Sequence, residues 1–394
     1  MKMKKLVLFG AGKIGRSFIG QLFGRSGYEV VFIDNNERVI FELNLKKKYR
    51  IVIKSDDSDE VIWVENVRGI LAANVDEIAS EISQADIMAI SVGQNSIRSI
   101  APTIAKGIQL RHKKNPDYPL DIILAENLRD AAKVMGSEIE KYISTPIDLD
   151  KYLGLIETSI GKMVPIMPNE IIEQNPLLVY AEPYNTLILD QLSFKNSIPN
   201  VVGLAPKKNM SAWVDRKFFI HNLGHAAAAY YGYVYYPELT YISEIMSKKD
   251  VYEYTKSTMS QSADILRKVY PDEFTEKDFL DHIEDLIYRF SNHALRDTVY
   301  RIGQDLYRKL GPEDRVVVAI KMGIKYSLPY DKILKIVGFA MRFKATDEQG
   351  LRSASDVKFC QEAEKGTSYI LEEVCGLSES EYPEVHILAN RSEH

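Results

Sequence analysis

The sequence contains few cysteines and no long hydrophobic run. Its two cysteines, Cys360 and Cys375, cannot form the disulfide framework of a small secreted domain, and no CxxC pair suggests a metal site. No apolar stretch reaches about 18 residues, the length that a membrane-spanning helix needs. Met1 leads directly into a predicted strand, without the apolar core of a signal peptide. These absences predict a cytoplasmic protein that does not enter a membrane.

The sequence also lacks an excess of basic charge. Its 50 Lys and Arg residues are outnumbered by 55 Asp and Glu residues, which gives a formal net charge of −5. No basic block resembles the charged patch of a nucleic-acid-binding domain, so we expect no nucleic-acid partner. A negatively charged small substrate would have to be held by local Lys and Arg side chains, because the protein as a whole does not attract it. Nothing in the sequence predicts the oligomeric state.

The 394 residues are more than one compact core usually requires, and the sequence changes character near residue 200. Before that point short apolar runs alternate with amphipathic stretches, which predicts an α/β domain, a Rossmann doubly wound parallel sheet, over 1–200. This domain includes a strand-rich extension at 151–190. After that point helical periodicity predicts a mostly α-helical substrate and catalytic domain over 201–394. Strands are predicted at 6–9, 29–33, 86–92, 121–124, 152–156 and 177–181, and helices at 13–26, 212–232, 250–269, 275–289, 292–310, 313–325 and 354–374.

The turn after the first predicted strand carries the fingerprint Gly10-Ala-Gly12-Lys13-Ile14-Gly15. In a G-x-G-x-x-G turn the first glycine permits the tight bend, the second lets the backbone approach a pyrophosphate, and the third lets the helix pack on the sheet. The amides that open the helix, with its dipole, would then face the phosphates. The motif alone is a weak signal, but here it follows a predicted strand and opens a predicted helix. It therefore predicts a dinucleotide site.

Asp34 lies 19 residues after Gly15, at the end of the second predicted strand. A carboxylate at this spacing accepts hydrogen bonds from the adenosine ribose, and it repels a 2′-phosphate, so NAD is favoured over NADP. Val92 and Gly93 end a later strand, where this fold brings the backbone close to the cofactor. A solvated Asp and an ordinary turn glycine are the simpler explanations of these residues.

The second domain carries the segment Lys217-Phe-Phe-Ile-His221-Asn222-Leu-Gly-His225. Helical periodicity puts Lys217, His221 and His225 along one face, with Asn222 beside them. Alcohol oxidation needs a base for the hydroxyl proton and donors for the reacting oxygen. A desolvated Lys217 could be the base, and Asn222 and His225 could hold the oxygen. Taken singly, these residues could be a solvated lysine and core histidines. Two His four residues apart also suggest zinc, but no third ligand follows at metal spacing, so we predict no metal.

The spacing Lys217-x4-Asn222-x2-His225 resembles the signature of the polyol-specific long-chain dehydrogenases and reductases. The resemblance covers nearly the whole chain, and its second long motif is Asp297-Thr298-x-x-Arg301-Ile-x-x-Asp305-x-x-x-Lys309-Leu310. Two shorter motifs are Glu126-Asn127-Leu128 and Glu182-Pro183.

The resemblance implies zinc-independent catalysis, with Lys217 as general base and with Asn222 and His225 polarising the reacting oxygen. It also implies that Asn127, Arg301 and Lys309 lie near the substrate. The short length and the sequence around Asn222 are most similar to the branch that interconverts mannitol 1-phosphate and fructose 6-phosphate with NAD. A hexuronate or unphosphorylated-polyol reductase and an NAD(H)-binding regulator are the alternatives. For a phosphorylated substrate, a single helix over 292–310 would gather Arg301, Arg308 and Lys309 as its anchor.

One segment departs from the family pattern. Where relatives have an Asp-Arg pair, this chain has Gly161-Lys162. Because the family Asp lies near the substrate or the catalytic lysine, its loss bears on which polyol is used. Glu157 is a nearby carboxylate that could compensate.

Overall fold

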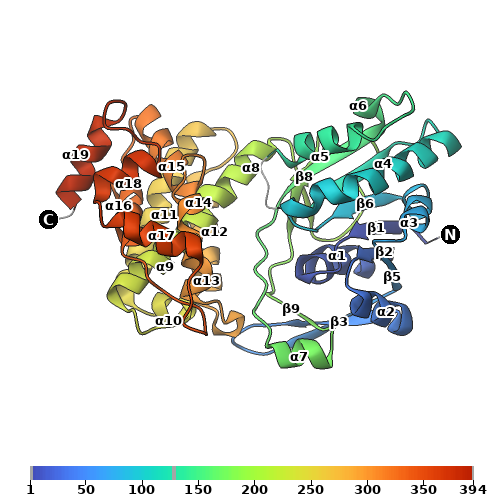
Figure 1. Ribbon diagram of the computed structural model, residues 1–394, viewed down its shortest axis with the longest axis horizontal. Helices are drawn as coiled ribbons and strands as arrows, with labels where there is room; N and C mark the ends of the chain where they lie inside the picture. The colour runs from blue at the N-terminus through green and yellow to red at the C-terminus, as the bar shows by residue number, and fades with distance from the viewer. Residues whose placement is uncertain (1–2, 127–129, 393–394) are drawn as a thin grey trace. The chain divides into compact units, whose positions relative to one another are not determined.

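The computed structural model describes residues 3–126 and 130–392. The chain divides into two compact units, Met1–Trp213 and Val214–His394. The first unit is a parallel sheet covered by helices and the second is mostly helical, which confirms the predicted fold class (Figure 1). Across the described residues no helix is both long and apolar enough to cross a bilayer.

The main sheet of the first unit has eight strands among the described residues, in the order β11-β10-β8-β7-β6-β1-β2-β5. All neighbouring pairs are parallel except β8 and β10. Strand β1 lies between β2 on one side and β6 on the other, so the chain connections leave β1 in opposite directions. Sheets of this kind bind ligands at this switch point. The strands are β1 (Lys5–Phe9), β2 (Glu29–Asp34), β5 (Val67–Leu71), β6 (Ile87–Ile90), β7 (Leu120–Leu124), β8 (Leu153–Ser159), β10 (Leu187–Asp190) and β11 (Leu204–Lys207).

The central strands β1, β6 and β7 are buried on both faces, as their continuous apolar sequences indicate. One face packs against the first three helical segments and a small sheet in the order β4-β3-β9, and the other face packs against later helices of this unit. The elements on the first face are η1 (Gly15–Ile19), α1 (Gly20–Arg25), α2 (Glu37–Lys46), β3 (Lys48–Ile53), β4 (Glu60–Glu65) and β9 (Val179–Ala181). Those on the second are α3 (Val75–Ile82), α4 (Ile97–Lys114) and α5 (Ala131–Glu140). Shorter helices are η2 (Gln94–Ser96), α6 (Leu149–Tyr152) and α7 (Asn169–Gln174).

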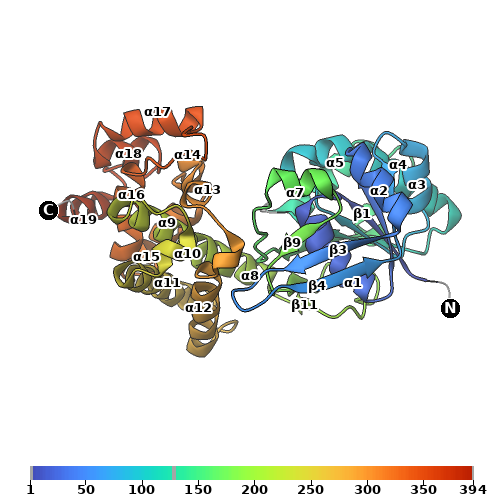
Figure 2. The same cartoon turned by 90° about the horizontal axis from the view of Figure 1, so that it is seen from below.

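The second unit is organised around α9 (Leu223–Tyr235), whose alanines Ala226–Ala229 are fully buried. Small side chains let α10, α11, α13 and α16 pack closely on it (Figure 2). The other helices are α8 (Met210–Arg216), η3 (Lys217–Asn222), α10 (Ile242–Met246), α11 (Lys249–Val269), α12 (Glu276–Phe290), η4 (His293–Leu295), α13 (Val299–Gly303), α14 (Leu306–Lys309), α15 (Arg315–Lys325), α16 (Asp331–Met341), α17 (Ala354–Ala363), α18 (Thr367–Glu373) and α19 (Pro383–Ser392).

Two predicted helices are wrong as single elements. The segment 292–310 is broken into η4, α13 and α14, because Arg296 and Asp305 adopt left-handed backbone conformations and Thr298 caps a new helix. The segment 354–374 is broken into α17 and α18 at Gly366, whose φ is +101°. The predicted common helical face for Arg301, Arg308 and Lys309 therefore does not exist.

Candidate active site

The glycine turn follows β1, and two of its glycines are required by close contacts. Gly10 has φ +100°, and a Cβ there would lie 2.1 Å from the Ser91 carbonyl oxygen. A Cβ on Gly15 would lie 2.1 Å from the carbonyl oxygen of Gly10. A Cβ on Gly12 would instead meet no atom within 4 Å. The backbone at Gly12 is therefore open, as a pyrophosphate contact requires.

Asp34 ends β2, which is parallel to β1, so its carboxylate lies beside the glycine turn. The amide of Ala11 donates to Asp34 Oδ2 at 2.7 Å, and the amide of Asn36 donates to Oδ1 at 2.9 Å. These bonds fix the direction of the carboxylate while each oxygen retains a further lone pair. The residue that the sequence assigns to the ribose is thus a preoriented acceptor.

A cavity of about 390 Å³ adjoins the turn, and it is lined by Gly12, Lys13, Ile14, Ser91, Gly93, Ala125, Glu126 and Ile160. Glu126 Oε1 accepts hydrogen bonds from the amides of Val92 (2.7 Å) and Gly93 (2.9 Å). Burial raises the pKa of Glu126, although these two bonds oppose the rise. The open Gly12 backbone, the helix-opening amides and Asp34 together fit a dinucleotide such as NAD.

Site assignment from sequence missed Glu126 as a contact of Val92 and Gly93. The only sequence signal was its place in the Glu126-Asn127-Leu128 motif. Asn127, the predicted substrate contact in that motif, lies outside the described residues.

Lys217 opens the π-helical segment η3, which ends at Asn222 and continues into α9. A π-helix bonds residue i to residue i+5, so it brings Asn222 nearer to the face of Lys217 than an α-helix would. Burial, and secondarily the charge of Arg315, lower the pKa of Lys217 to about 7. Much of Lys217 is therefore neutral near pH 7, the form that a general base requires.

His221 and His225 are both buried, and their ring centroids are 5.4 Å apart. The ring of His225 also stacks on Phe290 at 3.8 Å. Burial lowers the pKa of each histidine well below its ordinary value, and neighbouring cations add to the effect. Both rings are therefore neutral near pH 7, and each keeps one N–H donor.

The cations that lower the pKa of His225 after burial include Arg301, Arg289, Arg315 and Lys309. The fold thus brings Arg301 and Lys309 to the environment of the predicted catalytic histidine, although not along one helix. Arg301 Nε donates to Asp297 Oδ1 at 2.5 Å, and a second bond from its guanidinium reaches Oδ2 of the same carboxylate. The side chain of Arg301 remains 44% exposed.

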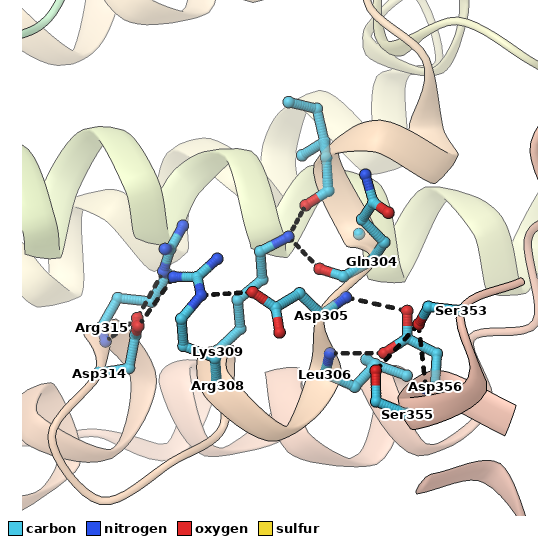
Figure 3. Close-up of polar contacts among 12 residues, drawn as sticks. Gln304, Asp305, Leu306, Arg308, Lys309, Asp314, Arg315, Ser353, Ser355 and Asp356 are labelled. Atoms are coloured by element: carbon cyan, nitrogen blue, oxygen red, sulfur yellow. Dashed lines mark hydrogen bonds and ion pairs between the residues drawn. The ribbon is translucent and has the colours of Figure 1, made fainter. Parts of the chain in front are cut away.

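Lys309 is buried beneath the C-terminus of α13 (Figure 3). Its ammonium donates to the carbonyl oxygen of Ile302 at 2.5 Å and to that of Gln304. These carbonyls lie where a helix leaves its acceptors unsatisfied and attracts positive charge. Burial, followed by the charges of Arg315 and Arg308, lowers the pKa of Lys309 to about 7.

The Gly161-Lys162 segment is held within the first unit. Lys162 is buried, and its ammonium donates to Asn185 Oδ1 at 2.9 Å. The amide of Met163 donates to the carboxylate of Glu182, from the Glu182-Pro183 motif. Glu157 accepts from the amide of Ala132 at the start of α5 at 3.0 Å, so its carboxylate serves as a helix-terminus acceptor.

His221 and His225 do not gain a third metal ligand in the described part of the chain. No group of three or more His, Cys, Asp or Glu side chains there is arranged to hold a metal ion.

Both units match one enzyme family. Residues 4–203 match the mannitol dehydrogenase Rossmann domain, and residues 209–374 match the mannitol dehydrogenase C-terminal domain. The chain belongs to the mannitol dehydrogenase family. The resemblance inferred from Lys217, Asn222 and His225 is therefore confirmed, as is the prediction of an NAD-dependent polyol dehydrogenase.

Curated relatives align along almost the whole chain. The mannitol-1-phosphate 5-dehydrogenase of Lactococcus lactis subsp. cremoris (strain MG1363) is 32% identical over 381 residues, with 95% of each chain covered. The enzyme of the same name from Enterococcus faecalis (strain ATCC 700802 / V583) is 29% identical, with 95% of this chain and 94% of that protein covered.

Solved structures share the fold at lower identity. A substrate-free D-sorbitol dehydrogenase superposes with a TM-score of 0.76 at 14% identity, covering 99% of this chain and 93% of that one. The mannitol 2-dehydrogenase of Pseudomonas fluorescens, in a ternary complex with NAD and D-mannitol, superposes with a TM-score of 0.69 at 15% identity. That alignment covers 99% of this chain and 91% of that one.

Proposed function

We propose that this enzyme interconverts mannitol 1-phosphate and fructose 6-phosphate, with NAD as hydride carrier and Lys217 as general base. The observation that carries the base assignment is that Lys217 and Asn222 are the first and last residues of one π-helical segment, and burial lowers the pKa of Lys217 to about 7. The curated relatives named mannitol-1-phosphate 5-dehydrogenase support the substrate pair.

NAD supplies the acceptor for the hydride that leaves the carbinol carbon. The neutral Lys217 amine takes the hydroxyl proton as the C–H bond breaks and the carbonyl forms. The Asn222 amide and the neutral His225 ring would donate hydrogen bonds to the reacting oxygen, which carries partial negative charge in the transition state. In ketose reduction the same ammonium returns the proton, so that direction needs Lys217 protonated.

The positive charges near His225 support an anionic substrate. Asp297 occupies one edge of the Arg301 guanidinium, and the remaining N–H groups of this partly exposed side chain suit a phosphate. In its protonated form Lys309 has three N–H donors, of which Ile302 and Gln304 use two, and an anionic ligand at the third would favour that form. We therefore propose Arg301 and Lys309, with Asn127, as substrate contacts.

A carboxylate would also suit these cations, so a hexuronate reductase is the second candidate. NADH oxidation measured with fructose 6-phosphate, fructose, fructuronate and tagaturonate separates the two. We expect the highest kcat/KM with fructose 6-phosphate. Equal or faster reduction of fructose or of a uronate would reject the phosphorylated substrate. Gly161-Lys162 would then mark a branch with another specificity.

A further inference from the structure

Arg315 is a buried cation at the start of α15, and it contacts the catalytic helix. Its guanidinium donates to the main-chain carbonyl oxygen of Asn222 at 3.3 Å, and its Nε donates to Asp314 Oδ1 at 2.7 Å. The guanidinium carbon lies 5.7 Å from the ring centroid of Phe218, which is also part of η3. Arg315 is only 9% exposed, so its contacts with η3 are made away from solvent.

A buried arginine is stable only when its charge is paired and hydrogen-bonded. Asp314 provides the pairing, and it also accepts from the amide of Arg315 (2.6 Å) and from Arg308 (3.2 Å) (Figure 3). The pair therefore connects three elements: α15, the C-terminal end of α14 and the last residue of η3. An arginine suits this place because it stays charged when buried and offers a rigid fork of donors.

We propose that Arg315 is a positioning residue for the catalytic helix, holding Asn222 by its carbonyl and presenting a permanent positive charge to the Lys217 amine. This proposal rests on the proposed function of Lys217. The carbonyl contact would restrain the helix at the residue whose side-chain amide faces the reacting oxygen. The charge would favour the neutral form of Lys217.

The charged groups around Lys217 support an electrostatic role for Arg315. From α15, the charge of Arg315 adds to burial in lowering the pKa of Lys217. On the helix of Lys217 itself lies His221, whose pKa Lys217 lowers further after burial. From α12, His282 and Arg289 act on His221 in the same direction. The buried positions of α11 are all uncharged: Val251, Thr255, Thr258, Met259, Ser262, Ala263, Ile265 and Leu266.

The same charge also acts on the second buried lysine. After burial, Arg315 is the largest cause that lowers the pKa of Lys309. Asp305 and Asp356 oppose that lowering. Arg315 therefore acts on both buried lysines in the same direction.

Two substitutions separate the two parts of the proposal. Arg315→Met removes the charge but keeps an unbranched side chain over Phe218, whereas Arg315→Lys keeps a cation without the planar fork. The ionisation of Lys217 is measured by competitive labelling with acetic anhydride across a pH series, read by mass spectrometry. The same variants are assayed for the pH profile of kcat, and NADH binding and thermal melting check folding.

For Arg315→Met we expect the labelling midpoint of Lys217 to rise by up to about one pH unit, because a nearby positive charge has been removed. The pH at which kcat for alcohol oxidation rises should shift upward by the same amount. For Arg315→Lys we expect a midpoint near that of the wild type but a kcat lowered by about tenfold or more, since a small misplacement of a donor is costly. Lys321→Met, which removes another cation of α15, is the matched control and should leave the midpoint of Lys217 in place.

An unchanged Lys217 midpoint in folded Arg315→Met would overturn the electrostatic part. Wild-type kcat in Arg315→Lys would overturn the positioning part. Labelling does not depend on turnover, so it tests the charge effect even if Lys217→Ala were to remain active and the base assignment were to fail. If Arg315→Met did not fold, Arg315→Gln would provide the neutral variant.

Discussion

The glycine turn of the first unit and the proposed catalytic helix of the second, η3 with the start of α9, both depart from regular secondary structure, but by different means. The turn depends on residues without side chains, since Gly10 and Gly15 leave no room for a Cβ. The helix depends on polar side chains, of which His221 and His225 are buried and Lys217 and Asn222 are half-buried, in a π-helical segment that continues into fully buried alanines. The turn offers main-chain amides to a ligand, whereas the helix offers side chains whose ionisation is changed by burial. The first arrangement is encoded locally and the second by tertiary packing.

The largest effect should come from removing Lys217, the proposed base. Lys217→Ala should lower kcat by a factor on the order of 10² to 10⁴ and leave NADH binding intact. In the wild type, alcohol oxidation should rise with pH through about 7, as Lys217 loses its proton, and ketose reduction should fall over the same range. Stopped-flow or steady-state assays in both directions provide the measurement.

The matched control for this prediction is Lys335→Ala, on α16, which removes a lysine outside the site. A Lys217→Ala enzyme with near-wild-type rates across the pH range would remove Lys217 from the mechanism. Strong inhibition by a chelator would instead revive the metal interpretation of His221 and His225.

The local encoding of the turn explains why it was predictable. Spacing alone related the three glycines to Asp34, and β1 and β2 place the carboxylate against the Ala11 amide as parallel neighbours must. On the helix, periodicity identified Lys217, Asn222 and His225, but an assumed α-helix could not show the π-helical segment that brings Asn222 toward Lys217. Arg315 contacts Asn222, and Glu126 contacts Val92 and Gly93, across long distances in the sequence. No local sequence pattern could therefore predict these contacts.

The wrong helix at 292–310 has a comparable cause. The apolar spacing is helical throughout, but Thr298 and Gly303 mark the start and end of a short helix that periodicity alone overlooks. The break has consequences for function, because it places the carbonyls of Ile302 and Gln304 over Lys309. Lys309, which the single-helix prediction placed beside the shared face of Arg301 and Arg308, is instead buried.

The comparison of the turn with the helix is tested next by two glycine substitutions. Gly15→Ala should force the Gly10 carbonyl to move, so we expect both a lower Tm and a loss of NADH binding. The decrease in Tm should be several degrees, because about 1 kcal/mol shifts Tm by roughly 2–4 °C for a domain of this size. Gly12→Ala should leave Tm close to that of the wild type, since its Cβ meets nothing, but should weaken NADH binding. Differential scanning fluorimetry and fluorescence titration measure the two effects. Equal NADH binding by Gly12→Ala and the wild type would mean that the pyrophosphate lies elsewhere.

Arg301 and Lys309 allow a similar separation within the second unit. Arg301→Ala should raise the KM for fructose 6-phosphate by roughly 10- to 100-fold, which corresponds to the free energy of one charge-assisted hydrogen bond. The KM for fructose should change little. Lys309→Met should raise the same KM and also lower Tm, because the carbonyls of Ile302 and Gln304 lose a buried donor. An unchanged ratio of the KM values for fructose 6-phosphate and fructose in both variants would show that neither side chain binds the phosphate.

The smallest effect should come from substituting Asp34, because we expect this change to alter mainly the preference between NADH and NADPH. Asp34→Asn keeps one oxygen, which can still accept from the Ala11 amide of the turn, while the Asn36 amide loses its acceptor. The substitution removes the negative charge that repels a 2′-phosphate. We expect the ratio of kcat/KM for NADPH to that for NADH to rise about tenfold, which corresponds to roughly 1.4 kcal/mol. Asp34→Ala removes the acceptor as well, so it should show the same change in preference together with weaker binding of both cofactors. The difference between the two variants measures how much of the role of Asp34 is to hold the turn and how much is to select the ribose. If the wild type already used NADPH better than NADH, the assignment of Asp34 to the ribose hydroxyls would be wrong.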